Sequence, residues 1–177
     1  MVIVIGERAT FKHAIEHGQM SESHSGGFMI VANADIYFDD TLKYVAYNAR
    51  LTDSNDQIRN KKCYALLRHE CVDGIPGKNS TTKFNPRSDS QDSWVMPIPF
   101  EFNASEAGFY FGKNGADNSI VQLFRNQGIH VSSPSTIIRS YHLHRSNGSR
   151  TYSNLDYVSI VGKTHINPFV RLTHVLY

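Results

Sequence analysis

Short apolar runs alternate with amphipathic stretches along most of the chain. The runs that predict strands lie at 2–5, 28–32, 63–67, 94–96, 129–131 and 136–143. The first two are continuously apolar, which is typical of strands that are buried on both faces. The tail over 157–177 alternates only weakly. Because the predicted strands alternate with helices, the pattern favours an α/β sheet with crossover connections.

Three segments have helical periodicity or helix-capping residues. Thr10 is expected to cap a helix over 11–18, and Thr41 is expected to cap a short helix that runs through 48. Residues 117–126 carry apolar side chains at helical spacing, and Gly128 provides a suitable C-terminal cap. In contrast, residues 73–90 are rich in Gly, Pro, Ser, Thr and Asn, which predicts a long loop.

Composition narrows the class of protein. The 177 residues suit a single domain over 1–177, with 40% hydrophobic and 19% charged residues. A formal net charge of +2 argues against nucleic acid as a partner. Two cysteines favour a reducing compartment. No leader-like start or membrane-length apolar run is present in the sequence, so we expect a cytoplasmic protein without a membrane span.

Polar side chains follow several predicted strands. Asn33-Ala34-Asp35 comes directly after an apolar run, Arg68 ends the run at 63–67, and His142 and His144 fall at the end of a later one. In α/β sheets, functional groups collect at the carboxyl ends of strands. Asp35 would suit a hard divalent cation, or it would accept backbone N–H bonds in a turn. Both interpretations stay open from this motif alone.

The other polar motifs each have a functional and a structural interpretation. His142 and His144 share one strand face and suit Mn²⁺ or Zn²⁺, or they are structural. Asp117, followed by Asn118, is a helix cap or a general base. Asp92 with Trp94 would recognise a sugar, or Trp94 would pack in the core.

Two arginines complete the set of candidate residues. Arg8 follows the first apolar run and Arg68 follows the third. The planar guanidinium group pairs with phosphate oxygens through two parallel hydrogen bonds, so either residue could bind a phosphorylated ligand. The alternative for each is an ordinary ion pair at the surface.

Taken together, these motifs resemble a group of GT-A-fold glycosyltransferases found in viruses, microbes and plants. The resemblance spans about 6–150, and its specificity comes from the order of five motifs rather than from any one. These motifs lie at 33–39, 65–68, 91–94, 115–118 and 141–144. The resemblance implies a Rossmann-type mixed sheet flanked by helices. It also implies a shortened domain, which lacks the usual first strand and helix and whose missing unit a partner chain could supply.

The family's metal site can be carried over to this sequence. GT-A enzymes hold a metal ion and the donor diphosphate with a strand-end Asp-x-Asp motif. Here Asn33 stands in place of the first Asp, so the resemblance implies Asp35 as metal ligand and Asn33 as a ribose contact, with Ala34 between them. The segment that begins at His142 resembles a His-x-x-Arg segment whose His binds manganese, which favours His142 over His144.

The remaining roles follow from the same resemblance. Gly-Ala-Asp-Asn resembles the Gly-x-Glu-Asn of polypeptide N-acetylgalactosaminyltransferases, so Asp117 would be the base. Arg8 and Thr10 lie where the family binds the nucleotide. The roles are then donor binding by Arg8, Thr10, Asn33, Ala34, Asp35 and Arg68, and sugar or acceptor binding by Asp92, Trp94 and Asn118.

The function implied is an inverting, Mn²⁺- or Mg²⁺-dependent transfer of sugar from a UDP- or GDP-linked donor to a hydroxyl of a glycan or other acceptor. It requires Asp35 and His142 to converge around one cation. A second hypothesis is a nucleotide-sugar or glycan-binding module without turnover. A third, a metal-dependent phosphoesterase, is less favoured because the sequence has few clustered carboxylates for a two-metal site.

Overall fold

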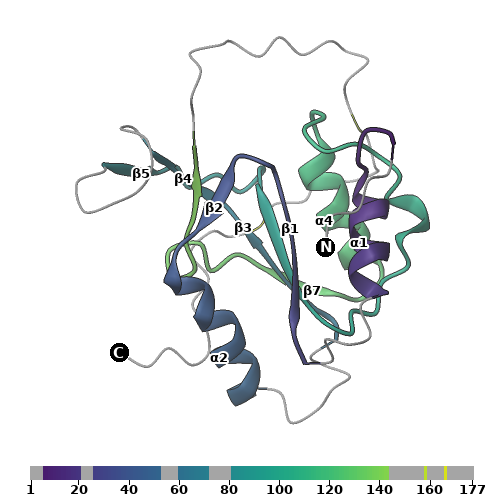
Figure 1. Cartoon of the computed structure of the whole chain (residues 1–177), viewed down its shortest axis with the longest axis horizontal. Coiled ribbons are helices and arrows are strands. Elements are labelled where there is room, and N and C mark those ends of the chain that lie inside the picture. Colours follow the sequence, from purple (N-terminus) through teal and green to yellow (C-terminus); the bar gives the residue numbers. More distant parts are fainter. Residues whose placement is uncertain are drawn as a thin grey trace.

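Two four-stranded sheets and three α-helices make up the part of the chain that the computed structural model describes (Figure 1). This part comprises residues 6–20, 26–52, 60–71 and 81–143, with residues 158 and 166. The mixed α/β class that the sequence predicts is therefore confirmed. The predicted strand at 2–5 and most of the tail lie outside the described residues.

The main sheet has the strand order β1-β6-β3-β7. Its strands are β1 (Phe28–Ala32), β6 (Ser93–Pro97), β3 (Lys62–Leu66) and β7 (His130–Ser132). Strand β6 runs antiparallel to both neighbours, while β3 and β7 are parallel. All four strands agree with the predicted runs to within one or two residues. Because β1 and β3 both oppose β6, their carboxyl ends meet at the same edge.

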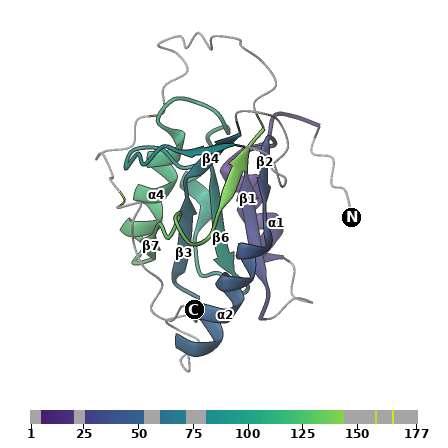
Figure 2. The ribbon, with the colours of Figure 1, turned by 90° about the vertical axis from the view of Figure 1, so that its left-hand side faces the viewer.

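The second sheet has the order β2-β8-β4-β5 and lies at the upper end of the main sheet in both views (Figures 1 and 2). Its strands are β2 (Ile36–Phe38), β8 (Ser140–His142), β4 (Arg68–Cys71) and β5 (Thr82–Phe84). Only the last part of the predicted strand over 136–143 forms a strand. Strand β5 falls inside the predicted loop at 73–90, because its pairing with β4 outweighs its polar composition.

Side chains of the main sheet alternate between two apolar clusters, as the two-residue period of a strand requires. Trp94 and Met96 belong to the cluster that contains α1 and α4 side chains, and Val95 belongs to the cluster on the opposite face. Ala65 and Leu66 divide in the same way. The prediction of a fully buried strand is wrong for β1, where Ile30 is 40% exposed and the pattern alternates.

The helices cover both faces of the main sheet. Helices α1 (Phe11–Gln19) and α4 (Ala116–Asn126) lie on one side, and α2 (Lys43–Thr52) lies on the other (Figure 1). Two short 3-10 helices are η2 (Asp40–Leu42) and η3 (Ala104–Glu106). Each of the described helices is too short or too polar to cross a membrane.

Two helix caps were predicted at threonines, and one prediction is confirmed. The Thr10 hydroxyl accepts a hydrogen bond from the His13 N–H at 3.2 Å and begins α1. At the second position the cap is Asp39, whose carboxylate accepts the Thr41 N–H at 2.9 Å. Asp39 rather than Thr41 takes the capping position because its carboxylate also accepts hydrogen bonds from the hydroxyls of Thr41 and Tyr141.

Close packing of α1 on β1 depends on Gly18. A Cβ atom at this position would overlap the Met29 sulfur. We expect Gly18→Ala to lower the free energy of unfolding, because overpacking costs about 1–3 kcal/mol and outweighs the ~1 kcal/mol gain in helix propensity. Gly108→Ala is the matched control, since a Cβ there meets no described atom within 4 Å. Equal urea midpoints for the two variants would contradict this account of the packing.

Candidate functional site

Two strand-to-strand junctions bring the ends of the main sheet and the second sheet together. A turn at Asn33-Ala34-Asp35 joins β1 to β2, closed by a hydrogen bond from the Ile36 N–H to the Asn33 carbonyl at 3.1 Å. Leu67 alone separates β3 from β4. Asp92 links the two junctions, because its carbonyl accepts the Asn33 N–H at 3.1 Å and its own N–H donates to Leu66 at 3.0 Å.

His142 lies between two carboxylates that come from different strands. Its Nε2 atom is 2.9 Å from Asp35 Oδ2, across 107 residues of sequence. Its Nδ1 atom is 2.8 Å from Glu70 Oε2. Strand pairing explains this arrangement, since Glu70 is opposite His142 in the β4–β8 register and the residue after Asp35 is opposite it in the β2–β8 register. The two side chains that the sequence predicts to converge, Asp35 and His142, are therefore in contact.

The Asp35–His142 geometry fits a divalent cation. In an octahedral site with ligands about 2.1 Å from the ion, two adjacent ligand atoms lie about 3.0 Å apart. The observed Nε2–Oδ2 distance of 2.9 Å is close to that value. Without an ion, the same distance suits a hydrogen bond between the imidazole and the Asp35 carboxylate. The arrangement therefore suits both a direct hydrogen bond and two positions of a metal shell.

Glu70 orients the imidazole ring for either role. A carboxylate that accepts the Nδ1–H fixes the tautomer and leaves the Nε2 lone pair for a metal, as in carboxylate–histidine–metal triads. Among the described residues, no group of three or more His, Cys, Asp or Glu side chains is arranged to hold one ion. Asp35 and His142 are thus the two side chains that could share one ion, with Glu70 behind the ring.

Glu70 is the residue that the sequence interpretation missed. The available signal was the two-residue period of β4, which places Arg68 and Glu70 on the same face. Burial raises the pKa of Glu70, but hydrogen bonds from His142 and Arg68 more than offset this, so the pKa is lowered overall. Glu70 is thus held as a carboxylate beside the ring.

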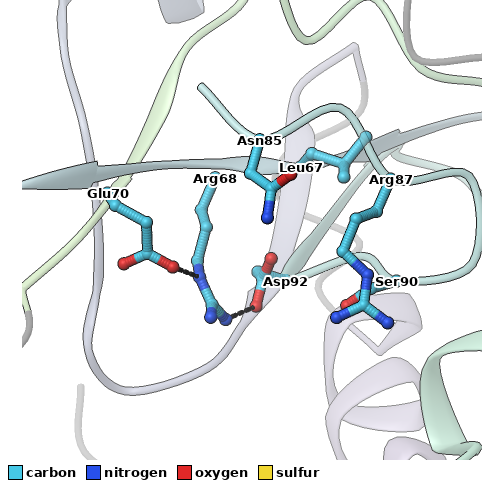
Figure 3. Close-up of a pocket in the computed structure, with 7 residues that line it drawn as sticks. All are labelled: Leu67, Arg68, Glu70, Asn85, Arg87, Ser90 and Asp92. Carbon is cyan, nitrogen blue, oxygen red and sulfur yellow. Dashed lines mark hydrogen bonds and ion pairs between the residues drawn. The ribbon is translucent and has the colours of Figure 1, made fainter. Parts of the chain in front are cut away.

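Arg68 extends the network from Glu70 to Asp92. Its Nε donates to Glu70 Oε1 at 2.7 Å, and its Nη1 donates to Asp92 Oδ1 at 2.5 Å (Figure 3). The Asp92 side chain is only 6% exposed. Burial raises its pKa, although the Arg68 guanidinium opposes that effect. One continuous chain of hydrogen-bonded polar groups therefore runs from Asp35 through His142, Glu70 and Arg68 to Asp92.

Asp117 lies near Asp92, in the first turn of α4. Helix α4 has Gly115 as its N-cap, at a φ of 82°, and no side chain caps it. The capping interpretation of Asp117 is therefore not what the structure shows. Its carboxylate accepts instead the Gln91 N–H and, at 3.5 Å, the Ser90 hydroxyl. Burial and the nearby charge of Asp92 raise its pKa to about 7.

A small open pocket of about 50 Å³ lies over Arg68 and Asp92 (Figure 3). Its other lining residues are Leu67, Glu70, Asn85, Arg87 and Ser90. Ser90 also contacts Asp117, so the pocket lies beside the carboxyl group that is poised to exchange a proton near neutral pH.

The remaining predicted site residues are placed apart from this network or are packed. Arg8 donates to the Phe111 carbonyl at 2.7 Å and lies over the Tyr110 ring, and Thr10 caps α1. Their donor-binding role stays a prediction. Trp94 is 1% exposed and packs edge-on against Phe11 at 4.8 Å, which is the core-packing alternative.

Asn118 and His144 complete the predicted set. The Oδ1 atom of Asn118 is buried and has no hydrogen-bond partner within the described part of the chain. A buried polar atom of this kind is costly unless it meets a ligand or water. His144 lies outside the described residues.

Comparison with known proteins adds no family assignment. No family model, no curated protein and no solved structure matches the chain. The class that the fold itself defines is a mixed α/β domain with two sheets.

Proposed function

We propose that this protein is a metal-dependent glycosyltransferase of the GT-A type that moves a sugar, with inversion, from a nucleotide-diphosphate donor to an acceptor hydroxyl. The observation that carries the proposal is the contact between Asp35 and His142 at one end of a hydrogen-bonded network whose other end, Asp92, lies near Asp117. Such a site combines a place for a cation with a base that ionises near neutral pH.

The donor side of the proposed site uses Asp35 and His142 as ligands of Mn²⁺ or Mg²⁺. A divalent ion bound there offsets the negative charge of a diphosphate leaving group. Glu70 keeps the imidazole oriented toward Asp35 through its 2.8 Å contact. Asn33 and Ala34 occupy the same turn, with Asn33 held by Asp92, and are proposed to contact the nucleotide.

The acceptor side uses Asp117. Its carboxylate takes the proton from the acceptor hydroxyl as the hydroxyl oxygen attacks the anomeric carbon and the bond to the diphosphate oxygen breaks. A pKa of about 7 suits this task, because the carboxylate is largely ionised above neutral pH and still accepts a proton readily. Asp92 and Arg68, whose charged groups form the floor of the adjacent pocket, orient the sugar.

An assay of donor turnover tests this proposal. Full-length protein with Mn²⁺ is incubated with UDP- and GDP-linked sugars, and free nucleotide and glycosylated acceptor are measured. We expect release of nucleoside diphosphate, and a transferred sugar whose anomeric configuration in NMR is opposite to that of the donor. Binding of the nucleotide sugar without any turnover would favour a binding module, and release of inorganic phosphate alone would contradict both.

A further inference from the structure

The pocket over Arg68 and Asp92 has a balance of charge and hydrogen-bonding groups that is informative about its ligand. It is lined by two guanidinium groups, from Arg68 and Arg87, and by two carboxylates, from Glu70 and Asp92, so the formal charges cancel. A site for a phosphate or a carboxylate would instead have an excess of positive charge. The cancellation favours an uncharged ligand.

The buried floor of the pocket has unused hydrogen-bonding capacity. The guanidinium group of Arg68 has five N–H donors, and its bonds to Glu70 and Asp92 use two of them. Asp92 gives Oδ1 to Arg68, which leaves Oδ2 without a partner within the described residues. An acceptor therefore lies next to donors on the floor. Hydroxyl groups, which both donate and accept, complement such an arrangement.

The opposite wall of the pocket adds donors and one apolar contact. Figure 3 shows the Asn85 amide pointing toward Asp92 from across the pocket. Asn85 is exposed, and in the described part of the chain its side chain has no hydrogen-bond partner. Leu67 provides an aliphatic surface for a C–H group. The combination of donor, acceptor and small apolar patch matches one edge of a sugar ring.

Size limits the ligand to such an edge. A volume of about 50 Å³ accommodates a few water-sized groups, each of which needs about 10–15 Å³ on the same measure. Two neighbouring hydroxyl groups fit, whereas a whole ring would extend out of the pocket. Arg87, which pairs with Asp89 through two contacts of 3.0 and 3.1 Å, stands at the exposed rim.

We propose that this pocket binds two hydroxyl groups of an uncharged hexose, the one on C6 among them, and discriminates against hexoses in which C6 is a carboxylate. A carboxylate placed there would lie against Asp92 and Glu70, with no unpaired arginine to compensate it. The proposal rests on the transferase function proposed above and names its substrate class. The preference can nevertheless be measured by binding alone, without turnover.

The test compares donors that differ only in one oxidised carbon. Calorimetric titration of the Mn²⁺-loaded full chain uses UDP-glucose against UDP-glucuronate, and GDP-mannose against GDP-mannuronate. One of the two pairs, linked to UDP or to GDP, is expected to bind. Within that pair, the uncharged sugar donor should have a Kd about tenfold or more below that of the uronate donor, which is the effect of one uncompensated charge. Equal affinity, or tighter binding of the uronate, would overturn the proposal.

A charge-only substitution at Asn85 sharpens the comparison. Asn85→Asp keeps the shape of the side chain and adds a negative charge, so the preference for the neutral donor should widen by several-fold. Asn85→Lys should narrow it. Ser105→Asp, at an exposed position of η3 that does not line the pocket, is the control and should leave the preference unchanged. No change with either Asn85 variant would show that the charge of this pocket does not set the preference.

A failure of the transferase function is distinguishable from a failure of this proposal. If no nucleotide sugar binds, the proposed transferase function is wrong. Binding of free methyl glucoside and methyl glucuronide then tests the proposal about the pocket by itself. Perturbation of the Asn85 side-chain amide resonance by millimolar glucoside, but not by glucuronide, would uphold the proposal. Absence of a perturbation by the glucoside would refute it.

Discussion

Replacing His142 with alanine is expected to weaken Mn²⁺-dependent donor binding by more than 100-fold and to abolish turnover. The reason is that the imidazole would supply one of two protein ligands, with Nε2 2.9 Å from Asp35 Oδ2. Glu70→Gln, which alters the group behind the ring and its contact with Arg68, should have a smaller effect of about 10–100-fold in metal affinity. Titration of Mn²⁺, followed by its electron paramagnetic resonance signal with and without UDP or GDP, measures both.

The control for this series is His130→Ala, because His130 is an exposed residue of β7 in the main sheet, away from the Asp35–His142 contact. Its metal affinity should equal that of the wild type. The proposed site would be ruled out by a His142→Ala variant that folds, as judged by circular dichroism, and still binds Mn²⁺ with unchanged affinity.

Asp117→Asn is expected to lower the rate of transfer by ~100- to 10,000-fold while leaving the donor Kd near that of the wild type. The amide keeps the shape of the side chain but cannot take a proton. In the wild type, the rate should rise with pH through about 7, because burial and Asp92 raise the pKa of Asp117 to about that value and only the ionised form is a base. Steady-state rates from pH 5.5 to 8.5 measure this.

The same substitution, Asp117→Asn, lowers the rate of transfer but should raise the stability of the fold. The pKa of Asp117 lies at about 7 in the folded protein, against an ordinary value of 3.8. Between these values the folded state binds more protons than the unfolded state, so the wild type loses stability as the pH rises. Asp117→Asn should therefore have a higher Tm than the wild type at pH 8, with a difference that shrinks toward pH 4. A pH-independent difference, or a variant with full activity, would contradict the assignment of Asp117 as base.

Periodicity in the sequence predicted the main sheet well because each of its strands buries apolar side chains. The runs at 28–32, 63–67 and 94–96 correspond to β1, β3 and β6. The second sheet was harder to predict, since its short strands are polar and depend on their neighbours. Thr82–Phe84 is the clearest case, because only its pairing with β4 distinguishes it from the loop around it.

For the site, the sequence predicted that Asp35, Arg68 and His142 would gather at strand ends, and they do. It could not predict that Arg68–Cys71 continues as a strand of the second sheet, and it therefore missed Glu70. The burial of Trp94 was also beyond the sequence, because a ring that follows a polar motif suits a sugar or a core equally well.

The measurement that tests the account most directly is a crystal structure of the protein soaked with Mn²⁺ and a nucleoside diphosphate, with anomalous scattering used to locate the ion. We predict one anomalous peak within bonding distance of both Asp35 and His142, with diphosphate oxygens completing its shell. The proposed metal site would be contradicted by a structure in which the diphosphate is fully occupied but its Mn²⁺ lies elsewhere on the surface. In that structure Asp35 and His142 would still be joined by a direct hydrogen bond.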